Sequence, residues 1–252
     1  MNAPIYRHFR FSGFSLIEMA IVLFIVALLL GGLLPTVSSQ MEQQRRNETR
    51  KLMTEVRDSL LGYVMANGRL PSPACGSIPT LPGVINNAGI ELIPASAALC
   101  TTGANDIAVL PWATLGVSET DAWGNRFTYR VKPLFASGVA PGTSASFLLS
   151  SSGDISIKES TTGNTVATNI PVVVLSHGVN ACGAYQPSGT RIDDDPATPA
   201  PIYCTDVDQQ ENTNNDITFI SKVSPTTAFD DLLIWISTNT LISRMVAANK
   251  LP

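Results

Sequence analysis

The residues able to do chemistry are few in this chain, and the first of them is a lone acid. Glu18 is the single charged side chain between Gly13 and Gln40, in a stretch that otherwise reads as a membrane anchor. An ionised side chain in hydrocarbon costs several kcal/mol, roughly 2.5–3.5 on insertion scales. A chain keeps such a charge only where the charge has a partner or a function.

A second group of acids crowds a Pro/Asn/Thr-rich stretch around Cys204. Hard oxygen ligands at that density can bind calcium, although their spacing does not match an EF-hand. The pattern favours a solvated acidic loop, and calcium binding through Asp206 and Asp208 is kept as a hypothesis. The group comprises Asp193, Asp194, Asp195, Asp206, Asp208, Glu211 and Asp216.

A catalytic site is not indicated. Beyond the first 13 residues the chain has one histidine, His177, between Ser176 and Gly178. A Ser-His-Asp triad would need a nucleophile and a carboxylate beside it, and no G-x-S-x-G elbow is present. No phosphate-binding or dinucleotide-binding glycine pattern occurs either. We expect His177 to be a turn residue at a strand end, and we expect neither an enzyme nor a cofactor.

The four cysteines, Cys75, Cys100, Cys182 and Cys204, all follow the apolar segment. No CxxC or Cys/His spacing is present, so zinc is weakly indicated. An even number of cysteines behind a membrane segment suits disulfides in an oxidising compartment. We favour the local pairing, Cys75 with Cys100 and Cys182 with Cys204, because each bond would staple a turn-rich loop. The alternative is four unpaired buried thiols.

The N-terminal segment has the charge pattern of a membrane anchor. Residues 1–13 carry Arg7, His8 and Arg10 and no acid. The apolar stretch from Phe14 to Val37 would be about 36 Å long as a helix, enough to span a bilayer. Basic residues before it place the N-terminus in the cytoplasm. No A-x-A pattern follows the stretch, so we expect it to stay attached to the chain.

The sequence Gly13-Phe14-Ser15-Leu16-Ile17-Glu18 resembles the processing site of type IV prepilins and of type II secretion pseudopilins. The resemblance implies that prepilin peptidase cleaves between Gly13 and Phe14 and that Phe14 is N-methylated. Glu18 is then the acidic fifth residue of the mature chain, and Pro35 is a helix-kinking proline. In the family model, the acid pairs with the N-terminal amine of a neighbouring subunit. The alternative is a plain anchor with Glu18 at the headgroup level.

The remaining chain predicts an amphipathic helix followed by a β-rich head. Apolar residues recur at helical spacing up to Asn67, where Asn67-Gly68 and two prolines end the helix. They are Leu52, Val56, Leu60 and Val64, broadened by Met53, Leu61 and Met65.

The head begins with an irregular connection over 70–109 and is expected to contain four strand segments and a terminal helix. The strands are predicted at 126–131, within the strand and turn of 146–154, at 170–176 and at 229–237, the last two side by side, and the helix at 241–248. Asp121-Ala122-Trp123-Gly124-Asn125 with its strand, and Ser146 to Asp154, resemble the head of the major pseudopilin.

These observations predict an α+β, pilin-like fold in which a long N-terminal helix packs on an antiparallel sheet with disulfide-stapled loops. The expected parts are a removed leader (1–13), a transmembrane or filament-core helix (14–37), its amphipathic continuation (38–67) and a periplasmic head (68–252). The expected partners are prepilin peptidase, other pilin or pseudopilin subunits, the inner membrane and its assembly platform. The net charge of -4 gives no case for nucleic acid.

The predicted function is that of a minor structural subunit of a type II secretion pseudopilus or a type IV pilus. The large head, about 185 residues, favours a minor subunit over a major one. The retained Glu18 argues mildly against the terminal position of a filament. The rival interpretation is a membrane-anchored periplasmic binding protein or enzyme with a coincidental N-terminus. The sequence leaves the choice between the two filaments open.

Overall fold

The computed structural model describes residues 15–80, 87–92, 107–192, 204–214, 216–223, 226 and 228–252, without the side chains of 29–37, 107 and 108. The chain divides into two compact units, Met1–Gln44 and Arg45–Pro252. Helix α1, Leu16–Asn67, contributes residues to both. It ends where expected, with Gly68 in the left-handed conformation just after it.

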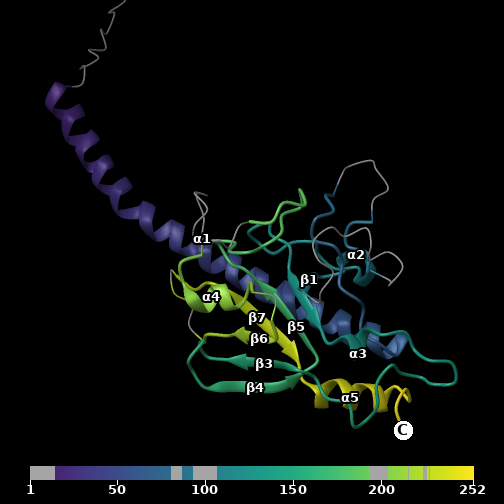
Figure 1. The fold of residues 1–252 in the computed structure, drawn as a ribbon. Coiled ribbons are helices and arrows are strands. Elements are labelled where there is room, and N and C mark those ends of the chain that lie inside the picture. The colour runs from purple at the N-terminus through teal and green to yellow at the C-terminus, as the bar shows by residue number, and fades with distance from the viewer. Residues whose placement is uncertain are drawn as a thin grey trace, which may run out of the picture. The chain divides into compact units, whose positions relative to one another are not determined.

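The described residues of the second unit form two sheets (Figure 1). The larger has the order β1 (Ile107–Val109), β2 (Thr128–Val131), β5 (Val172–Ser176) and β7 (Leu232–Ile236), with every pair antiparallel. The smaller has the order β4 (Thr165–Ile170), β3 (Ile155–Lys158) and β6 (Thr218–Ile220). Its β3 and β6 are parallel, which the predicted all-antiparallel sheet did not include.

The described residues contain four further helices, each shorter than α1. They are α2 (Trp112–Leu115), α3 (Pro133–Ala136), α4 (Val207–Glu211) and α5 (Thr238–Ala247). The terminal helix α5 begins three residues before the predicted start, because Ser237 caps it by accepting a hydrogen bond from the Thr240 N–H.

The main core lies between α1 and the larger sheet. The predicted apolar stripe of α1 is confirmed: Met53, Val56, Leu60 and Val64 are each at most 1% exposed. Of the other predicted members, Leu61 is buried, and Leu52 and Met65 are partly buried at the edge of the core. They pack with one face of β2, β5 and β7 and with residues of α3 and α5. Helical periodicity therefore identified the face of α1 that the head covers.

Strand β5 has an unbroken apolar sequence because it is buried on both faces. Val172 and Val174 belong to the core against α1, whereas Val173 belongs to a second core with Ile155, Ile157 and other residues of the smaller sheet. Alternate side chains of a strand point to opposite faces, so a strand covered on both faces needs no polar alternation. The predicted pairing of β5 with β7 is confirmed.

One predicted strand is wrong. Residues 146–150 form turns rather than a strand, and the nearest strand, β3, begins only at Ile155. Phe147 is nevertheless buried and lies 4.7 Å, centroid to centroid, from the Phe135 ring. The buried Phe147 side chain therefore holds this segment against the core. The following residues, Leu148 and Leu149, are exposed, so their apolar character does not indicate a buried strand.

The cysteine pattern is confirmed in part. Cys182 and Cys204 form a disulfide with their Cα atoms 5.5 Å apart. Cys75 is disulfide-bonded as well, and its expected partner Cys100 lies outside the described residues. No cysteine in the described part of the chain is free, so the alternative of unpaired thiols is wrong there.

Candidate functional site

The described chain starts at the N-terminus of α1, where Ser15 and Glu18 cap the helix reciprocally. The Ser15 N–H donates to Glu18 Oε2 at 3.2 Å, and the Glu18 N–H donates to Ser15 Oγ at 3.4 Å. This is a capping box, which satisfies two of the free N–H groups at a helix start. Glu18 therefore has a local partner within its own chain. Gly13 and Phe14, the expected cleavage site, lie outside the described residues.

The first turns of α1 are apolar all the way round. Every large apolar side chain between Leu16 and Leu28 is exposed, Leu16 and Ile17 most of all at 90% and 70%. A helix that is apolar on all sides is normally covered by other protein or by lipid. Among the described residues, no helix meets the length and apolarity that crossing a membrane demands. Pro35 lies within α1, but its side chain is outside the description.

His177 is a buried structural residue. It is 1% exposed, and a 2.7 Å hydrogen bond joins its Nε2 to the hydroxyl of Thr128. Burial and the nearby Arg191 lower the pKa of His177 to about 3, so the ring is neutral. The neighbouring Ser176 hydroxyl donates to Asp121 rather than to the histidine. Ser176, His177 and Asp121 therefore do not form a catalytic triad, because the serine hydroxyl donates to the aspartate and the histidine is bonded to Thr128.

The acids proposed for calcium have other partners in the fold. Asp206 Oδ1 caps α4 by accepting from the N–H groups of Asp208 and Gln209. Asp208 is 8% exposed and is held by Thr161 and by Lys222, whose Nζ lies 2.7 Å from Asp208 Oδ2. A freely solvated loop is thus the wrong description of Asp208.

No group of three potential metal ligands occurs among the described positions. Asp193, Asp194 and Asp195 lie outside them. Calcium binding stays a prediction.

Two further acids are buried at the start of β7. Asp230 Oδ2 accepts from the N–H groups of Val179 and Asn180, while Asp231 Oδ2 accepts from the Asn212 amide at 2.7 Å. Gln209 donates to both carboxylates. Burial, reinforced by the charge of Asp230, raises the pKa of Asp231 to about 8. These acids join α4 to the turn after β5 and leave no free ligand atoms pointing at a common centre.

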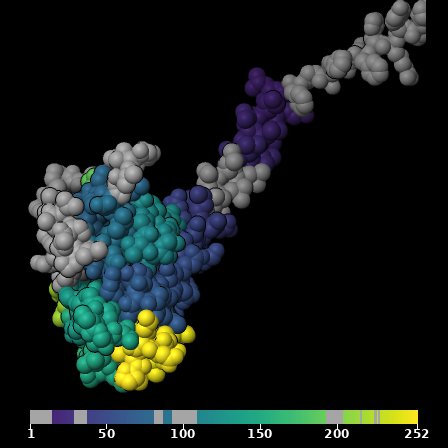
Figure 2. Space-filling model, turned by 90° about the vertical axis from the view of Figure 1, so that its right-hand side faces the viewer, coloured from purple at the N-terminus to yellow at the C-terminus, as the bar shows by residue number. Residues whose placement is uncertain are grey.

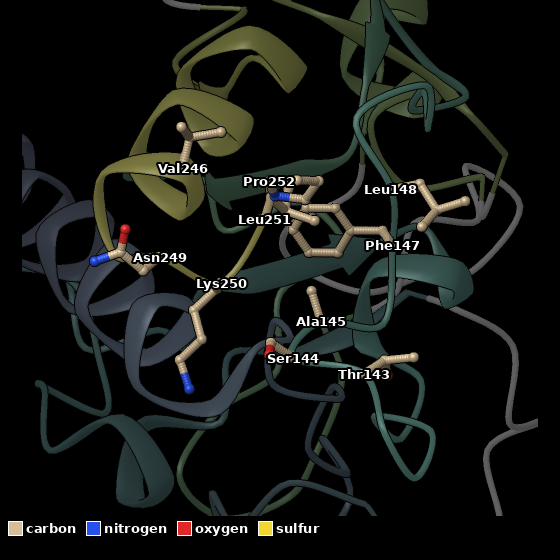
Figure 3. A pocket seen from close by; sticks show the side chains of 10 residues that line it. All are labelled: Thr143, Ser144, Ala145, Phe147, Leu148, Val246, Asn249, Lys250, Leu251 and Pro252. Atoms are coloured by element: carbon tan, nitrogen blue, oxygen red, sulfur yellow. The ribbon is translucent and has the colours of Figure 1, made fainter.

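A surface pocket of about 500 Å³ lies between the 143–148 segment and the C-terminal residues 246–252. Figure 2 shows this side of the molecule, with the C-terminal residues in yellow beside teal residues from the middle of the chain. Figure 3 shows Phe147, Leu148 and Leu251 on one side and Lys250 below them. The lining of this pocket contains no histidine, cysteine or acidic side chain. Its polar side chains are Thr143, Ser144, Asn249 and Lys250, so Lys250 is the one ionisable side chain among the pocket residues.

The carboxylate of Glu91 joins its own loop to Tyr63 in α1 and to residues just after that helix. Its carboxylate accepts two hydrogen bonds from Arg69, at 2.7 and 2.8 Å, one from the Tyr63 hydroxyl and one from the Ser72 N–H. Burial by itself raises the pKa of Glu91, but these donors outweigh it and lower the pKa. The same contact and its burial raise the pKa of Tyr63 to about 12.

A Glu91→Gln variant is expected to be less stable than wild type above about pH 5 and to approach it below the carboxylate's lowered pKa. A depressed carboxylate pKa stabilises the folded state only while the group is ionised, so the contribution disappears as pH falls. Melting temperatures of both proteins between pH 3 and 7 measure the effect. Glu55→Gln on the exposed face of α1 is the control, and a pH-independent difference for Glu91→Gln contradicts the assignment.

Sequence reasoning missed two of these contacts, for different reasons. The capping box is visible as Ser15-x-x-Glu18, a spacing with a known meaning at helix starts. The contacts of Glu91 join segments far apart in the chain, and no local pattern marks this residue.

Comparison with known proteins finds one similarity, and it covers the N-terminus. Residues 9–34 match the family model described as the prokaryotic N-terminal methylation motif. No curated protein and no solved structure matches the chain. The matched segment contains Gly13, Phe14 and the capping-box pair, and it ends one residue before Pro35. The chain therefore carries, at residues 9–34, the N-terminal methylation motif of prepilin-type cleavage and methylation proteins.

Proposed function

We propose that this protein is a pilin-type structural subunit. Prepilin peptidase cleaves it after Gly13, Phe14 is N-methylated, and residues 14–67 carry it into a type II secretion pseudopilus or a type IV pilus. The supporting observation is the methylation motif at residues 9–34, placed at the start of a helix of 52 residues. The packing of that helix's second half under a β-rich head agrees with this role.

The exposed apolar helix supports the proposed location. Before assembly, residues 14–37 anchor the subunit in the inner membrane, with the N-terminus in the cytoplasm and the head in the periplasm. During assembly, the same apolar surface is covered by helices of other subunits, which removes it from lipid without exposing it to water. One segment can thus serve first as an anchor and then as the filament core.

The proposed role is that of a minor component without enzymatic activity. This proposal is supported by the burial of His177, which is hydrogen-bonded to Thr128, and by a pocket in which Lys250 is the one ionisable side chain. No contact among the described residues favours the rival interpretation of a membrane-anchored binding protein or enzyme. Glu18 in its acidic position suits a subunit that follows another one in the filament.

Processing tests the proposal directly. Mass spectrometry of the full chain, isolated from membranes of cells that contain prepilin peptidase, is expected to give an N-terminal peptide that begins at Phe14 and carries one methyl group. A Gly13→Val variant should accumulate with its leader attached. An intact Met1 in the wild-type protein, or a cut near Ser38, would overturn the proposal.

A further inference from the structure

The pocket between the 143–148 segment and the C-terminal residues is formed by two parts of the chain that are far apart in the sequence. The first part is held in place by Phe147, which is buried against the Phe135 ring. It is held also by the Ser146 N–H, which donates to the Gly68 carbonyl at 3.0 Å. This wall of the pocket is therefore fixed by the core of the head.

The end of α5 fixes the opposite wall. Asn249 has a left-handed backbone conformation with a φ of 54°, and the Lys250 N–H donates to the Met245 carbonyl at 2.9 Å. Such a closed turn is common after a helix. The next residue, Leu251, is buried and belongs to the main core. Both walls are thus formed before any ligand binds, which reduces the entropy lost on binding.

The apolar part of the lining is only partly covered by the protein itself. Leu148 is 68% exposed and Val246 is 40% exposed, and both lie beside the buried Phe147 and Leu251. Figure 3 shows Phe147 and Leu251 next to each other, with Lys250 and Ser144 below them. Apolar side chains that gather around a pocket mark a surface for a ligand, whereas exposed ones scattered singly do not.

The charge of the lining comes from Lys250. Among the residues that the structure describes, Lys250 forms no ion pair, and its ammonium donates no hydrogen bond to another residue. Pro252, which also lines the pocket, is exposed and forms no ion pair with Lys250. A partly buried ammonium beside an apolar surface therefore lacks a counter-charge from the described chain.

The sequence around the pocket favours an anion as well. Residues 133–152 contain no charged side chain, and residues 232–252 contain two, Arg244 and Lys250. Both are positive, although the chain as a whole has a net charge of -4. An anion in the pocket therefore meets no like charge from either of the segments that form it.

We propose that this pocket binds a small amphipathic carboxylate. Its apolar tail lies against Leu148, Val246 and Leu251, and its carboxylate lies at the Lys250 ammonium. The pocket volume of about 500 Å³ falls within the range of small-molecule sites, about 300–1,000 Å³. One ammonium balances one negative charge, so a monocarboxylate is a better match than a phosphate monoester, which carries nearly two.

The inference goes beyond the proposed function. The pocket contains no residue of α1, so binding does not depend on cleavage after Gly13 or on assembly. The failure of either proposal therefore leaves the other untouched.

Photolabelling of the full chain tests the site. The chain is reconstituted in nanodiscs of zwitterionic lipid, and the probe is octanoate with a photoreactive diazirine in its tail. Mass spectrometry of the peptides is expected to place the label at residues 143–148 and 246–252. Excess octanoate should suppress the label. Acetate, which lacks the tail, and octanol, which lacks the charge, should suppress it much less at the same concentration.

Two variants separate the charge from the apolar surface. Lys250→Met and Leu148→Ser are each expected to lower the labelling about tenfold, because the first removes the charged donor and the second an apolar contact. Lys51→Met, on the exposed face of α1, is the matched control and should label like wild type. Melting curves of all three variants check that they fold.

Each other outcome contradicts the proposal. A label spread over the head, or competition by octanol equal to that by octanoate, shows that no carboxylate site exists. Stronger competition by octyl phosphate shows that the ligand class is wrong. A cation after a helix also stabilises the C-terminal end of that helix. If Lys250 does only this, Lys250→Met lowers the melting temperature and leaves the labelling unchanged.

Discussion

A Glu18→Ala variant is expected to be cleaved like wild type and yet to enter filaments at least 100-fold less, because a buried ion pair that loses one partner costs about 3–5 kcal/mol, and every 1.4 kcal/mol is a factor of ten. Under the proposed function, cleavage after Gly13 gives Phe14 a cationic amine. In a filament core, we expect that amine and a neighbour's carboxylate to neutralise each other where water is absent. Without the carboxylate, the amine is buried alone.

The capping box supplies the controls that separate charge from helix capping. Glu18→Gln keeps a side chain that can accept from the Ser15 N–H but removes the charge, so it should fail like alanine. Ser15→Ala removes the other half of the box and keeps the carboxylate, so it should assemble close to wild type. Filament fractions sheared from cells, with the N-terminal peptide measured in parallel, give both readouts. Normal assembly of the glutamine variant would show that capping, rather than charge, is what assembly needs.

An Arg126→Ala variant is expected to lose about 3–5 kcal/mol of unfolding free energy, the range found when one partner of a buried charge network is removed. Arg126 is 0% exposed, although an arginine is among the residues least often fully buried. Its Nε and Nη2 donate to Glu119 Oε1, and its Nη1 donates to the carbonyls of Gly76 and Ile78 at 2.7 and 2.8 Å.

The same guanidinium joins segments that are distant in the chain. Nη2 also donates to the Thr80 hydroxyl and the Pro187 carbonyl, and the Trp112 ring lies 4.6 Å away, measured from its centroid to Cζ. Truncation would leave the Glu119 carboxylate and three carbonyl groups with fewer partners in a buried place, which is costly. One side chain therefore holds the loop after α1, the turn before β2 and the loop after β5 together.

Urea unfolding of the full chain in detergent, followed by tryptophan fluorescence, measures the Arg126 effect. Arg126→Lys keeps the charge but cannot reproduce the planar fork of donors, so it should recover only part of the loss. Arg57→Ala, on the exposed face of α1, is the matched surface control and should change stability by no more than about 0.5 kcal/mol. A loss below about 1 kcal/mol for Arg126→Ala would mean that the network relaxes around the missing side chain.

Local patterns in the sequence predicted those parts of the fold that depend on neighbours along the chain. The i+4 spacing of Val56, Leu60 and Val64 identified the buried face of α1, and Asn67-Gly68 marked its end. The apolar run of β5 and the later run of β7 indicated two buried strands. The capping box, the methylation motif and the Cys182–Cys204 pairing are likewise readable from short stretches.

The contacts that tertiary structure decided are those between distant segments. The residues next to Arg126 in the sequence do not indicate that it is fully buried. The residues next to Glu91 do not indicate that its partner is Arg69, 22 residues away in the sequence. The same limit applies to β3 and β6, which pair in parallel only because the chain returns past α4 to bring them together. The turn structure of 146–150 shows the converse, since a strand-like pattern forms no strand where no neighbouring strand pairs with it.

The sequence by itself determined the features of the N-terminal segment. These are the methylation motif, the acid Glu18 five residues beyond Gly13 in an apolar helix, and the Ser15-x-x-Glu18 spacing of a capping box. Those features act through residues within one or two helical turns of each other, so spacing alone reveals them. Only the tertiary structure decided which charges are buried in the head and which stay outside on α1. Burial depends on what the rest of the chain places against a residue, and the spacing of residues along the sequence does not show this.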